Sequence, residues 1–406
     1  MHFRFLTLKE IDVRKKRVLV REDLNVPMKD GEILDYKRID ASLHTLRYLA
    51  EHDAKVIVVS HLGRPDGKPN PKYSLKPVAN ALSKRLAMDV TFATDVVGPS
   101  AHKAIDAIDF GQIVMLENVR FEPGEEQNDP AFARELADLA EVYVNDAFGT
   151  AHRAHASTEG VAHYLPSAAG FLMQAEIAAL SKLVEDPQHP YVCVIGGAKV
   201  KDKVGVFTKL MEKVQAFCIG GGMANTFLAA RGVDVGKSLR DDDLEPAKAI
   251  LQLATTRDVS MLLPVDAVVS TSFDNDAGAH AVDLAQVGDT VILDIGPKTA
   301  HEYAKVIETA KTVVFNGPMG VYEKEAYREG TRVIGEAMKH ATEHGATTVV
   351  GGGDAAAAAE ELGFAEYVTH VSTGGGATLE FLEGKELPGI TALEQAKDLA
   401  GQDARR

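Results

Sequence analysis

The sequence has few cysteines and lacks an apolar run long enough to cross a membrane. Cys193 and Cys218 are the only cysteines in 406 residues, which excludes a disulfide framework, and no C-x-x-C pair is present that could form a metal knuckle. This usage predicts a reducing, cytoplasmic compartment. Charges occur throughout the first 21 residues, so we expect no signal peptide. The longest uncharged stretches, 161–175 and 214–230, contain polar residues and glycine, which argues against a membrane partner.

The chain also lacks a surplus of positive charge. It has 44 Lys and Arg against 59 Asp and Glu, a formal net charge of −15, which argues against a protein that binds nucleic acid by neutralising phosphates. Several catalytic signatures are absent, namely H-E-x-x-H, G-x-S-x-G and the H-R-D set of protein kinases. The length suggests two or three domains at roughly 150 residues each, and the 45% apolar and 25% charged residues are typical of folded proteins.

Short β-branched runs alternate with helical patterns along the chain. The expected strands are 17–20, 55–59, 113–116, 142–144, 191–195, 216–219, 260–263, 312–315 and 347–350, and the clearest expected helices are 38–52, 75–88, 130–140 and 174–184. Nearly all-apolar strands separated by helices predict an α/β protein with parallel sheets covered on both faces. Such sheets bind ligands beyond the carboxyl ends of their strands, so the loops after these runs are the candidate sites.

Basic side chains follow the expected strands of the first half. The loops after the first, second, third and fourth strands carry Arg21 and Arg38, His61 and Arg64, Arg120, and Arg153 respectively. A single Arg is usually a solvated surface charge. Four loops that bring Arg to one sheet edge instead predict a pocket for a polyanion, because guanidinium offers a fixed fork of donors for phosphate and carboxylate. Each histidine alone could be an ordinary hydrogen-bonded side chain.

Glycines occupy the matching positions of the second half. Clusters follow successive strands at 196–197, 220–222, 317–320, 351–353 and 374–376. One such cluster usually marks a tight turn. Several clusters, each after a buried strand, favour a nucleotide site, since glycine lets backbone N–H groups approach phosphate oxygens. Together with the arginines, they predict a phosphotransferase acting on two anionic substrates.

Two other functions are compatible with parts of this pattern. The segment 351–356 fits a loose G-x-G-x-x-A dinucleotide motif, but no acidic strand end follows at about 20 residues, which argues against an NAD-linked oxidoreductase. The segment 232–238 resembles a P-loop but is one residue short. A non-catalytic nucleotide- or sugar-phosphate-binding protein on the same fold remains the alternative, because fold alone does not establish activity.

Seven segments taken together resemble phosphoglycerate kinase. They are REDLNVP at 21–27, SHLGRP at 60–65, ENVRF at 117–121, NDAFGTAHRAH at 145–155, GGAKVKDK at 196–203, NGPMGVYE at 316–323 and STGGGA at 372–377. They occur in order over essentially the whole chain and are highly specific as a set. The resemblance implies two Rossmann-like parallel-sheet domains, joined by a hinge helix, with a cleft between them. It also implies a hinge-bending monomer that transfers a phosphoryl group reversibly, in line and with domain closure. The reaction converts 1,3-bisphosphoglycerate and ADP to 3-phosphoglycerate and ATP, with Mg²⁺, in glycolysis and gluconeogenesis.

The resemblance also implies the domain limits and the residues of the site. The expected parts are an N-terminal phosphoglycerate-binding domain at 1–173 with 389–406 packed back on it, a linker helix and hinge at 174–187, and a nucleotide-binding domain at 188–388. The substrate residues would be Asp23, Asn25, Arg38, His61, Leu62, Gly63, Arg64, Arg120 and Arg153. The nucleotide residues would be Gly196, Gly197, Ala198, Lys199, Lys203, Gly220, Gly221, Gly222, Asn316, Pro318, Gly320, Val321, Glu323, Gly352, Gly353, Asp354 and Ala355.

The catalytic residues implied in this way are Arg38 and Lys203, which would balance charge on the transferring phosphoryl group, and Gly374, Gly375 and Gly376, which would present backbone N–H groups to it. Asp354 would lie near the metal. Ala355 is a departure from the family, which usually has Thr or Ser at this position. We therefore expect no side-chain role for Ala355 and a role for its backbone N–H only.

Overall fold

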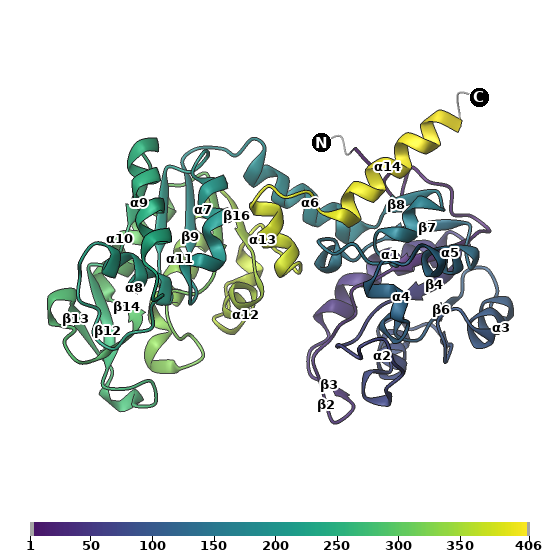
Figure 1. Ribbon diagram of the computed structural model, residues 1–406, viewed down its shortest axis with the longest axis horizontal. Coiled ribbons are helices and arrows are strands. Elements are labelled where there is room, and N and C mark those ends of the chain that lie inside the picture. The colour runs from purple at the N-terminus through teal and green to yellow at the C-terminus, as the bar shows by residue number, and fades with distance from the viewer. Residues whose placement is uncertain (1–3, 404–406) are drawn as a thin grey trace. The chain divides into compact units, whose positions relative to one another are not determined.

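The structure, a computed structural model, describes residues 4–403 and the side chains of residues 4–396. Its contacts divide the chain into two compact units (Figure 1). Unit 1 is Met1–Ala178 with Glu386–Arg406, and unit 2 is Ala179–Lys385. The division falls inside helix α6 (Phe171–Val184), whereas the sequence predicted the first domain to end at residue 173 with a linker over 174–187.

Unit 1 is built on a six-stranded parallel sheet in the order β5-β6-β4-β1-β7-β8. The strands are β1 (Arg17–Arg21), β4 (Lys55–Val59), β5 (Val90–Phe92), β6 (Ile113–Met115), β7 (Val142–Asn145) and β8 (Ser167–Ala169), and a short hairpin joins β2 (Met28–Lys29) to β3 (Glu32–Ile33). Alternate valines of β1, β4 and β7 lie in one apolar cluster with Leu46 and Leu49 of α1 (Lys37–Glu51) and with Leu82 of α2 (Lys76–Leu86). The helix-to-sheet packing therefore follows the strand periodicity that the sequence shows.

The remaining helices of unit 1 are α3 (Pro99–Ala107), α4 (Pro123–Glu126), α5 (Pro130–Asp138) and α14 (Pro388–Asp403), with 3₁₀ turns η1 (Pro71–Tyr73), η2 (Val119–Phe121), η3 (Phe148–Thr150) and η4 (Gly160–His163). Helix α14 packs against η4 and β8. At its start, Gly389 donates its N–H to the carbonyl of Ala151 at 2.9 Å. The end of the chain thus returns to the first unit.

Unit 2 contains a second six-stranded parallel sheet, in the order β11-β10-β9-β15-β16-β17. Its strands are β9 (Tyr191–Ile195), β10 (Ala216–Ile219), β11 (Ser260–Leu262), β15 (Thr312–Asn316), β16 (Thr347–Val350) and β17 (His370–Val371). Counted in chain order within this sheet, the arrangement is that of the dinucleotide-binding fold, whose ligand site lies where the strand order reverses. Here that point lies between β9 and β15.

Helices surround this sheet, and a small antiparallel sheet lies in the same unit. The helices are α7 (Val204–Leu210), α8 (Gly221–Ala230), α9 (Glu245–Arg257), α10 (Pro297–Glu308), α11 (Glu329–Glu343), α12 (Gly353–Glu361) and α13 (Gly376–Leu382). The short 3₁₀ turns are η5 (Val200–Lys203), η6 (Asp276–Gly278), η7 (Leu284–Gln286), η8 (Glu325–Tyr327) and η9 (Ala365–Tyr367). The antiparallel strands β12 (Asp266–Ser270), β13 (His280–Asp283) and β14 (Val291–Ile295) pair in the order β13-β12-β14.

The α/β fold with two parallel sheets is confirmed, and the expected strands all form within one residue of their predicted ends. The antiparallel sheet, the β2–β3 hairpin and the edge strands β5 and β8 were not predicted. Among the described residues, no helix has the length and apolar character needed to cross a bilayer.

Candidate active site

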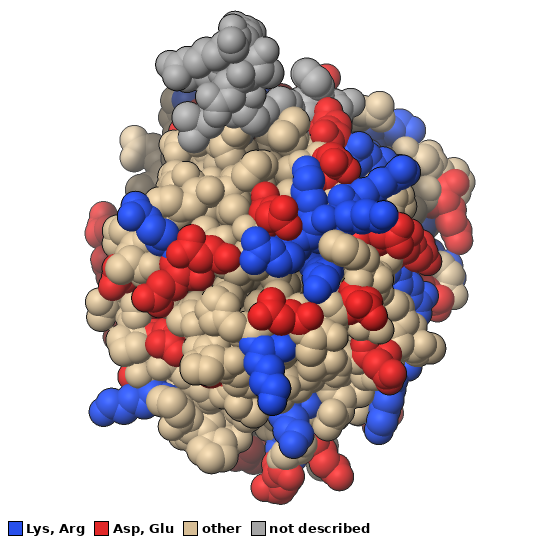
Figure 2. All heavy atoms as spheres, turned by 90° about the vertical axis from the view of Figure 1, so that its right-hand side faces the viewer, with Lys and Arg blue, Asp and Glu red and all other residues tan. Residues whose placement is uncertain are grey.

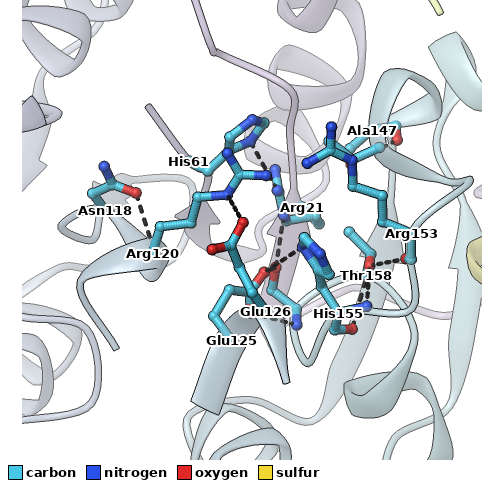
Figure 3. A network of polar contacts seen from close by, with 12 residues as sticks. Arg21, His61, Asn118, Arg120, Glu125, Glu126, Ala147, Arg153, His155 and Thr158 are labelled. Carbon is cyan, nitrogen blue, oxygen red and sulfur yellow. Dashed lines mark hydrogen bonds and ion pairs between the residues drawn. The ribbon is translucent and has the colours of Figure 1, made fainter. Parts of the chain in front are cut away.

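The arginine-bearing loops of unit 1 converge on His61, which follows β4. Arg21 is the last residue of β1 and is buried, and its Nη2 donates to Nδ1 of His61 at 3.1 Å (Figure 3). Burial, together with the charges of Arg21, Arg120, Arg38 and Arg153, holds the pKa of His61 well below its usual value. His61 is therefore neutral and lies within a cluster of guanidinium groups, as the strand-end positions predicted.

Arg120 lies in η2 and is almost fully buried. Its Nη1 donates to the carbonyl of Gly63 at 2.7 Å, and its Nε lies 3.2 Å from Oε1 of Glu126. Its Nη2 is buried without a hydrogen-bond partner in the structure. A buried guanidinium N–H without an acceptor lowers the stability of the fold. This atom is therefore suited to donate a hydrogen bond to an oxygen of an anionic ligand.

Arg38 and Asp23 form an ion pair at the start of α1. Asp23 packs so closely on Gly149 that a Cβ there would come within 2.3 Å of the carboxylate. Asn25 accepts the N–H of Gly63 at 2.9 Å, next to the buried Leu62. These contacts fix the loops after β1 and β4 relative to Arg38.

Arg153 is half-buried, and its Nε lies 3.3 Å from Nε2 of His152. Arg64, in contrast, is exposed on the loop after β4. Among the described contacts of this cluster, none involves the Arg64 side chain. The structure thus brings Arg38, His61, Arg120 and Arg153 together and leaves Arg64 at the surface.

A buried polar layer supports this cluster and was not among the predicted site residues. Arg21 donates to Ser157 Oγ at 2.8 Å, and Ser157 in turn donates from N and Oγ to Glu125 at 2.9 and 2.6 Å. His155 lies beside Glu125, and burial with the neighbouring arginines lowers the pKa of His155 to about 3. The positive charge of the cluster therefore comes from arginine and not from histidine. The sequence signal for this buried polar layer was the position of Arg21 at the end of β1.

In unit 2, Lys203 marks the point where the strand order reverses. It ends η5, and its Nζ donates to the carbonyls of Gly196 and Asn316, both at 2.7 Å, which follow β9 and end β15. Burial lowers the pKa of Lys203 to about 8. A Cβ on Gly196 would lie 2.0 Å from the carbonyl oxygen of Pro318, so this crossing of loops requires glycine.

A cavity of about 730 Å³ opens beside these loops, in the range of ligand sites. Its lining includes the predicted residues Gly197, Ala198, Gly221, Gly222, Pro318, Gly320, Val321, Glu323 and Asp354. Leu228, Leu239, Ile292 and Leu293 add an apolar wall. Part of that wall belongs to the antiparallel sheet, so the sequence identified the polar and glycine-rich side of the cavity and missed the apolar side.

Asp294 of β14 is the least expected residue of this wall. It is buried, accepts the N–H of Gly330 at 2.7 Å, and burial raises its pKa to about 8. A Cβ on Gly320 or on Gly330 would come within 2.4 Å of its Oδ1. Asp294 therefore holds the loop after β15 and the start of α11 in place.

The other predicted nucleotide residues do not belong to the lining of the cavity. Gly220 and Asn316 are buried, and Lys199 and Gly353 are exposed. Gly352, at φ 102, precedes α12. The Ala355 side chain packs in the apolar core of the unit, in keeping with the absence of a side-chain role.

The last of the five glycine clusters, at 374–376, leads into α13. Gly374 is buried and donates its N–H to Ser372 Oγ at 3.2 Å, and Gly375 has a φ of 52, which favours glycine, before Gly376 begins the helix.

Asp354 is the residue that could contribute to a metal site. It is exposed in the first turn of α12 and lines the cavity. Within the described residues, no cluster of three or more His, Cys, Asp or Glu could hold a metal ion. A lone carboxylate beside a nucleotide cavity fits Mg²⁺, which commonly takes one or two carboxylates and completes its shell with substrate phosphates and water.

A dinucleotide-type unit with a glycine-lined cavity and a second unit with an arginine cluster define a phosphotransferase of small anionic molecules. The sequence model of the family described as "Phosphoglycerate kinase" matches residues 8–385. The chain is 53% identical to the phosphoglycerate kinase of Chloroflexus aurantiacus over 396 residues, which is 96% of this chain and 99% of the relative. It is 54% identical over 392 residues to that of Moorella thermoacetica, with the same shares covered.

Comparison with solved structures also finds phosphoglycerate kinases. The phosphoglycerate kinase of Coxiella burnetii superposes with a TM-score of 0.89 at 43% identity, over 97% of this chain and 100% of that one. That of Pyrococcus horikoshii superposes with a TM-score of 0.81 at 33% identity, over 97% and 99%. The chain belongs to the phosphoglycerate kinase family. It is a glycolytic phosphotransferase with a carboxyl group as acceptor and ATP and ADP as nucleotides, and the non-catalytic alternative is not favoured.

Proposed function

We propose that unit 1 binds the phosphoglycerate and that unit 2 binds the nucleotide, so that each substrate has its own set of loops. The observation that carries this proposal is the convergence of four arginines on neutral His61 in unit 1. An acyl phosphate or phosphoglycerate presents phosphate and carboxylate oxygens, which match guanidinium donors. The cavity of unit 2, with its apolar wall and glycine backbone, suits a nucleoside with phosphates.

The proposed chemistry needs no protein nucleophile. In the direction of ATP use, a carboxylate oxygen of 3-phosphoglycerate attacks the γ-phosphorus in line, and the bond from phosphorus to the bridging oxygen of ADP breaks. Catalysis is then positioning and charge stabilisation. Arg38, oriented by Asp23, and Lys203, oriented by two carbonyls, are the cations proposed to balance charge on the group in transfer.

Backbone and metal contributions complete the proposed site. Gly374, Gly375 and Gly376 would direct backbone N–H groups to the migrating phosphoryl group. Asp354 would hold Mg²⁺ together with the nucleotide phosphates, and the ion would neutralise phosphate charge when bound. Glu323 would accept hydrogen bonds from the ribose hydroxyls.

Direct transfer requires the two substrates to meet and water to be excluded. We therefore propose that the units close on their substrates during turnover, with α6 as the hinge region.

We further propose a cytoplasmic monomer that does not bind nucleic acid. Both cysteines are free and buried, which supports a reducing compartment. On the face shown in Figure 2, one group of Lys and Arg lies above the centre and has Asp and Glu around it, which argues against an extended basic surface there.

Steady-state kinetics of matched variants test the division of substrates. Arg153→Met should raise the KM for the phosphoglycerate while leaving the KM for ATP near its original value, and Glu323→Gln should do the reverse. Arg134→Met is the control, because Arg134 stacks on Tyr164 at the surface of unit 1. Equal effects of Arg153→Met on both substrates would count against the proposal.

A further inference from the structure

The loop between β12 and β13 carries an aromatic side chain at the nucleotide cavity. Phe273 lines the cavity, yet half of its surface, 50%, is exposed. The loop around it is polar and largely exposed, with Asp274, Asn275 and Asp276 following the ring. A loop of this kind gains little from apolar burial, so its position depends on specific contacts.

Lys324, which also lines the cavity, supplies several of those contacts. Its Nζ donates to the carbonyl of Phe273 at 2.6 Å and to Oδ1 of Asp276 at 3.0 Å. The same ammonium lies 4.2 Å from the centre of the Phe273 ring, within the range of a cation–π contact. One lysine therefore holds the backbone, the ring and the acidic end of the loop.

Lys324 belongs to the segment that supplies the proposed ribose contact. Glu323 precedes it and, like Val321, lines the cavity. The N–H of Lys324 donates to the carbonyl of Val321 at 3.1 Å. A second tether comes from Tyr327, whose hydroxyl donates to the carbonyl of Asn275 at 3.2 Å. The segment 321–327 and the loop 271–276 are thus joined at two points, and the stronger of the two is Lys324.

We propose that Lys324 is a positioning residue for the nucleoside end of the nucleotide, acting by pinning the 271–276 loop so that Phe273 forms a fixed wall of the cavity. This inference rests on the proposed placement of the nucleotide in unit 2. Lys324 acts through Phe273 and does not itself bind the phosphates. Its loss leaves the loop to be ordered at the moment of binding, which lowers affinity for the nucleoside.

The test compares ligands with and without a nucleoside. We expect Lys324→Met, which keeps the length of the side chain but removes its charge and donors, to raise the Kd of ADP about tenfold, the order expected for loss of a charge-assisted tether. The Kd of inorganic tripolyphosphate and the KM for the phosphoglycerate should not change. Lys324→Arg should restore ADP binding, and Phe273→Ala should weaken it as Lys324→Met does. Binding is measured by titration calorimetry on the full chain, with melting curves to show that each variant is folded.

Three results would overturn the inference. ADP binding unaffected by Lys324→Met excludes the tether. An equal loss for tripolyphosphate means that the ammonium acts on phosphate charge. If Lys324→Arg binds ADP as weakly as Lys324→Met, a positively charged donor at position 324 is not what holds the loop. Leu239→Glu separates this inference from the placement of the nucleotide, because Leu239 lines the same cavity. If Leu239→Glu weakens ADP binding and Lys324→Met does not, only the tether is wrong, whereas no effect of either variant refutes the placement too.

Discussion

The buried ammonium of Lys203 should give nucleotide use a defined dependence on pH. Burial lowers the pKa of Lys203 from 10.5 to about 8, a change worth on the order of 3 kcal/mol in the free energy of holding the proton. The sign follows from the chemistry: the cation is present below the folded-state pKa and is lost as the pH rises through it. At one pH unit above that pKa, about a tenth of the free protein retains the charge.

The prediction concerns kcat/KM for ATP, which reports the free enzyme. It should fall above pH 8 by about tenfold for each pH unit, while kcat should hold to higher pH because bound phosphates favour the ammonium. Lys203→Arg should remove this decline, since guanidinium stays charged. The larger side chain of arginine changes the absolute value of kcat/KM, so the quantity compared is the shape of its pH dependence.

Asp294 titrates in the same range and must be separated from Lys203. Burial raises the pKa of Asp294 to about 8, so this wall of the cavity gains negative charge as the pH rises. The comparison is therefore made in an Asp294→Asn background. A coupled assay with 3-phosphoglycerate and ATP is run from about pH 6.5 to 9.5, a range that spans the titration of both groups. Lys199→Arg is the control, because Lys199 is an exposed lysine nearby in the sequence. An unchanged alkaline decline in the Lys203→Arg variant of that background would exclude Lys203 as the titrating group.

Three further predictions concern single side chains. Arg38→Ala should lower kcat by about a hundredfold or more with a smaller effect on the KM for ATP, because a cation aimed at developing charge acts mainly in the transition state; steady-state kinetics check this, and near-normal kcat would exclude the role. Gly196→Ala should abolish ADP binding in calorimetry and lower the melting temperature, since its Cβ would lie 2.0 Å from the carbonyl oxygen of Pro318, and a variant with ordinary ADP affinity would contradict the crossing of these loops. Asp146→Asn should stabilise the chain near pH 7.5 by up to about 3 kcal/mol, because burial raises the pKa of Asp146 to about 6 and its Oδ2 has no hydrogen-bond partner. This gain should shrink to about 0.5 kcal/mol at about pH 4, where the carboxyl is almost fully protonated in the folded state but only partly protonated in the unfolded state, and urea unfolding at both pH values measures it.

The parallel sheets and the edges where the site lies could be predicted from the sequence, because both follow from local pattern. Strands such as Tyr191–Ile195 are apolar on both faces and are followed by glycine, and the nine expected strands end within one residue of their predicted ends. Since the carboxyl ends of parallel strands share an edge, the convergence of Arg38, Arg120 and Arg153 followed from one-dimensional spacing.

The antiparallel sheet could not be predicted in the same way. No α-helix separates β12, β13 and β14, so these strands break the alternation of strand and helix on which the prediction depended, and β13 is largely exposed. Strands β12 and β14 contain buried carboxylates, which usually argue against a strand. The structure explains them: Asp266 accepts N–H groups at the start of α10 at 2.9 Å, and Asp294 accepts one near the start of α11.

The burial of individual polar side chains also could not be predicted from the sequence. In the sequence Arg21 is one of several arginines, and only the fold shows that it lies beneath His61 and is itself almost fully buried. Whether a charge lies in a pocket or behind it depends on residues far away in the chain, here Ser157 and Glu125. Arg64 is the opposite case, since it shares the motif of His61 and yet is exposed.

The central claim is that each substrate binds to its own unit. Amide chemical shifts of the labelled chain, recorded with ADP alone and with 3-phosphoglycerate alone, test it most directly. ADP should perturb residues around Gly197, Gly222 and Val321 in unit 2, and 3-phosphoglycerate should perturb residues around His61 and Arg120 in unit 1. Strong perturbation of the same residues by both ligands, or ADP shifts centred on the arginine cluster, would contradict the account.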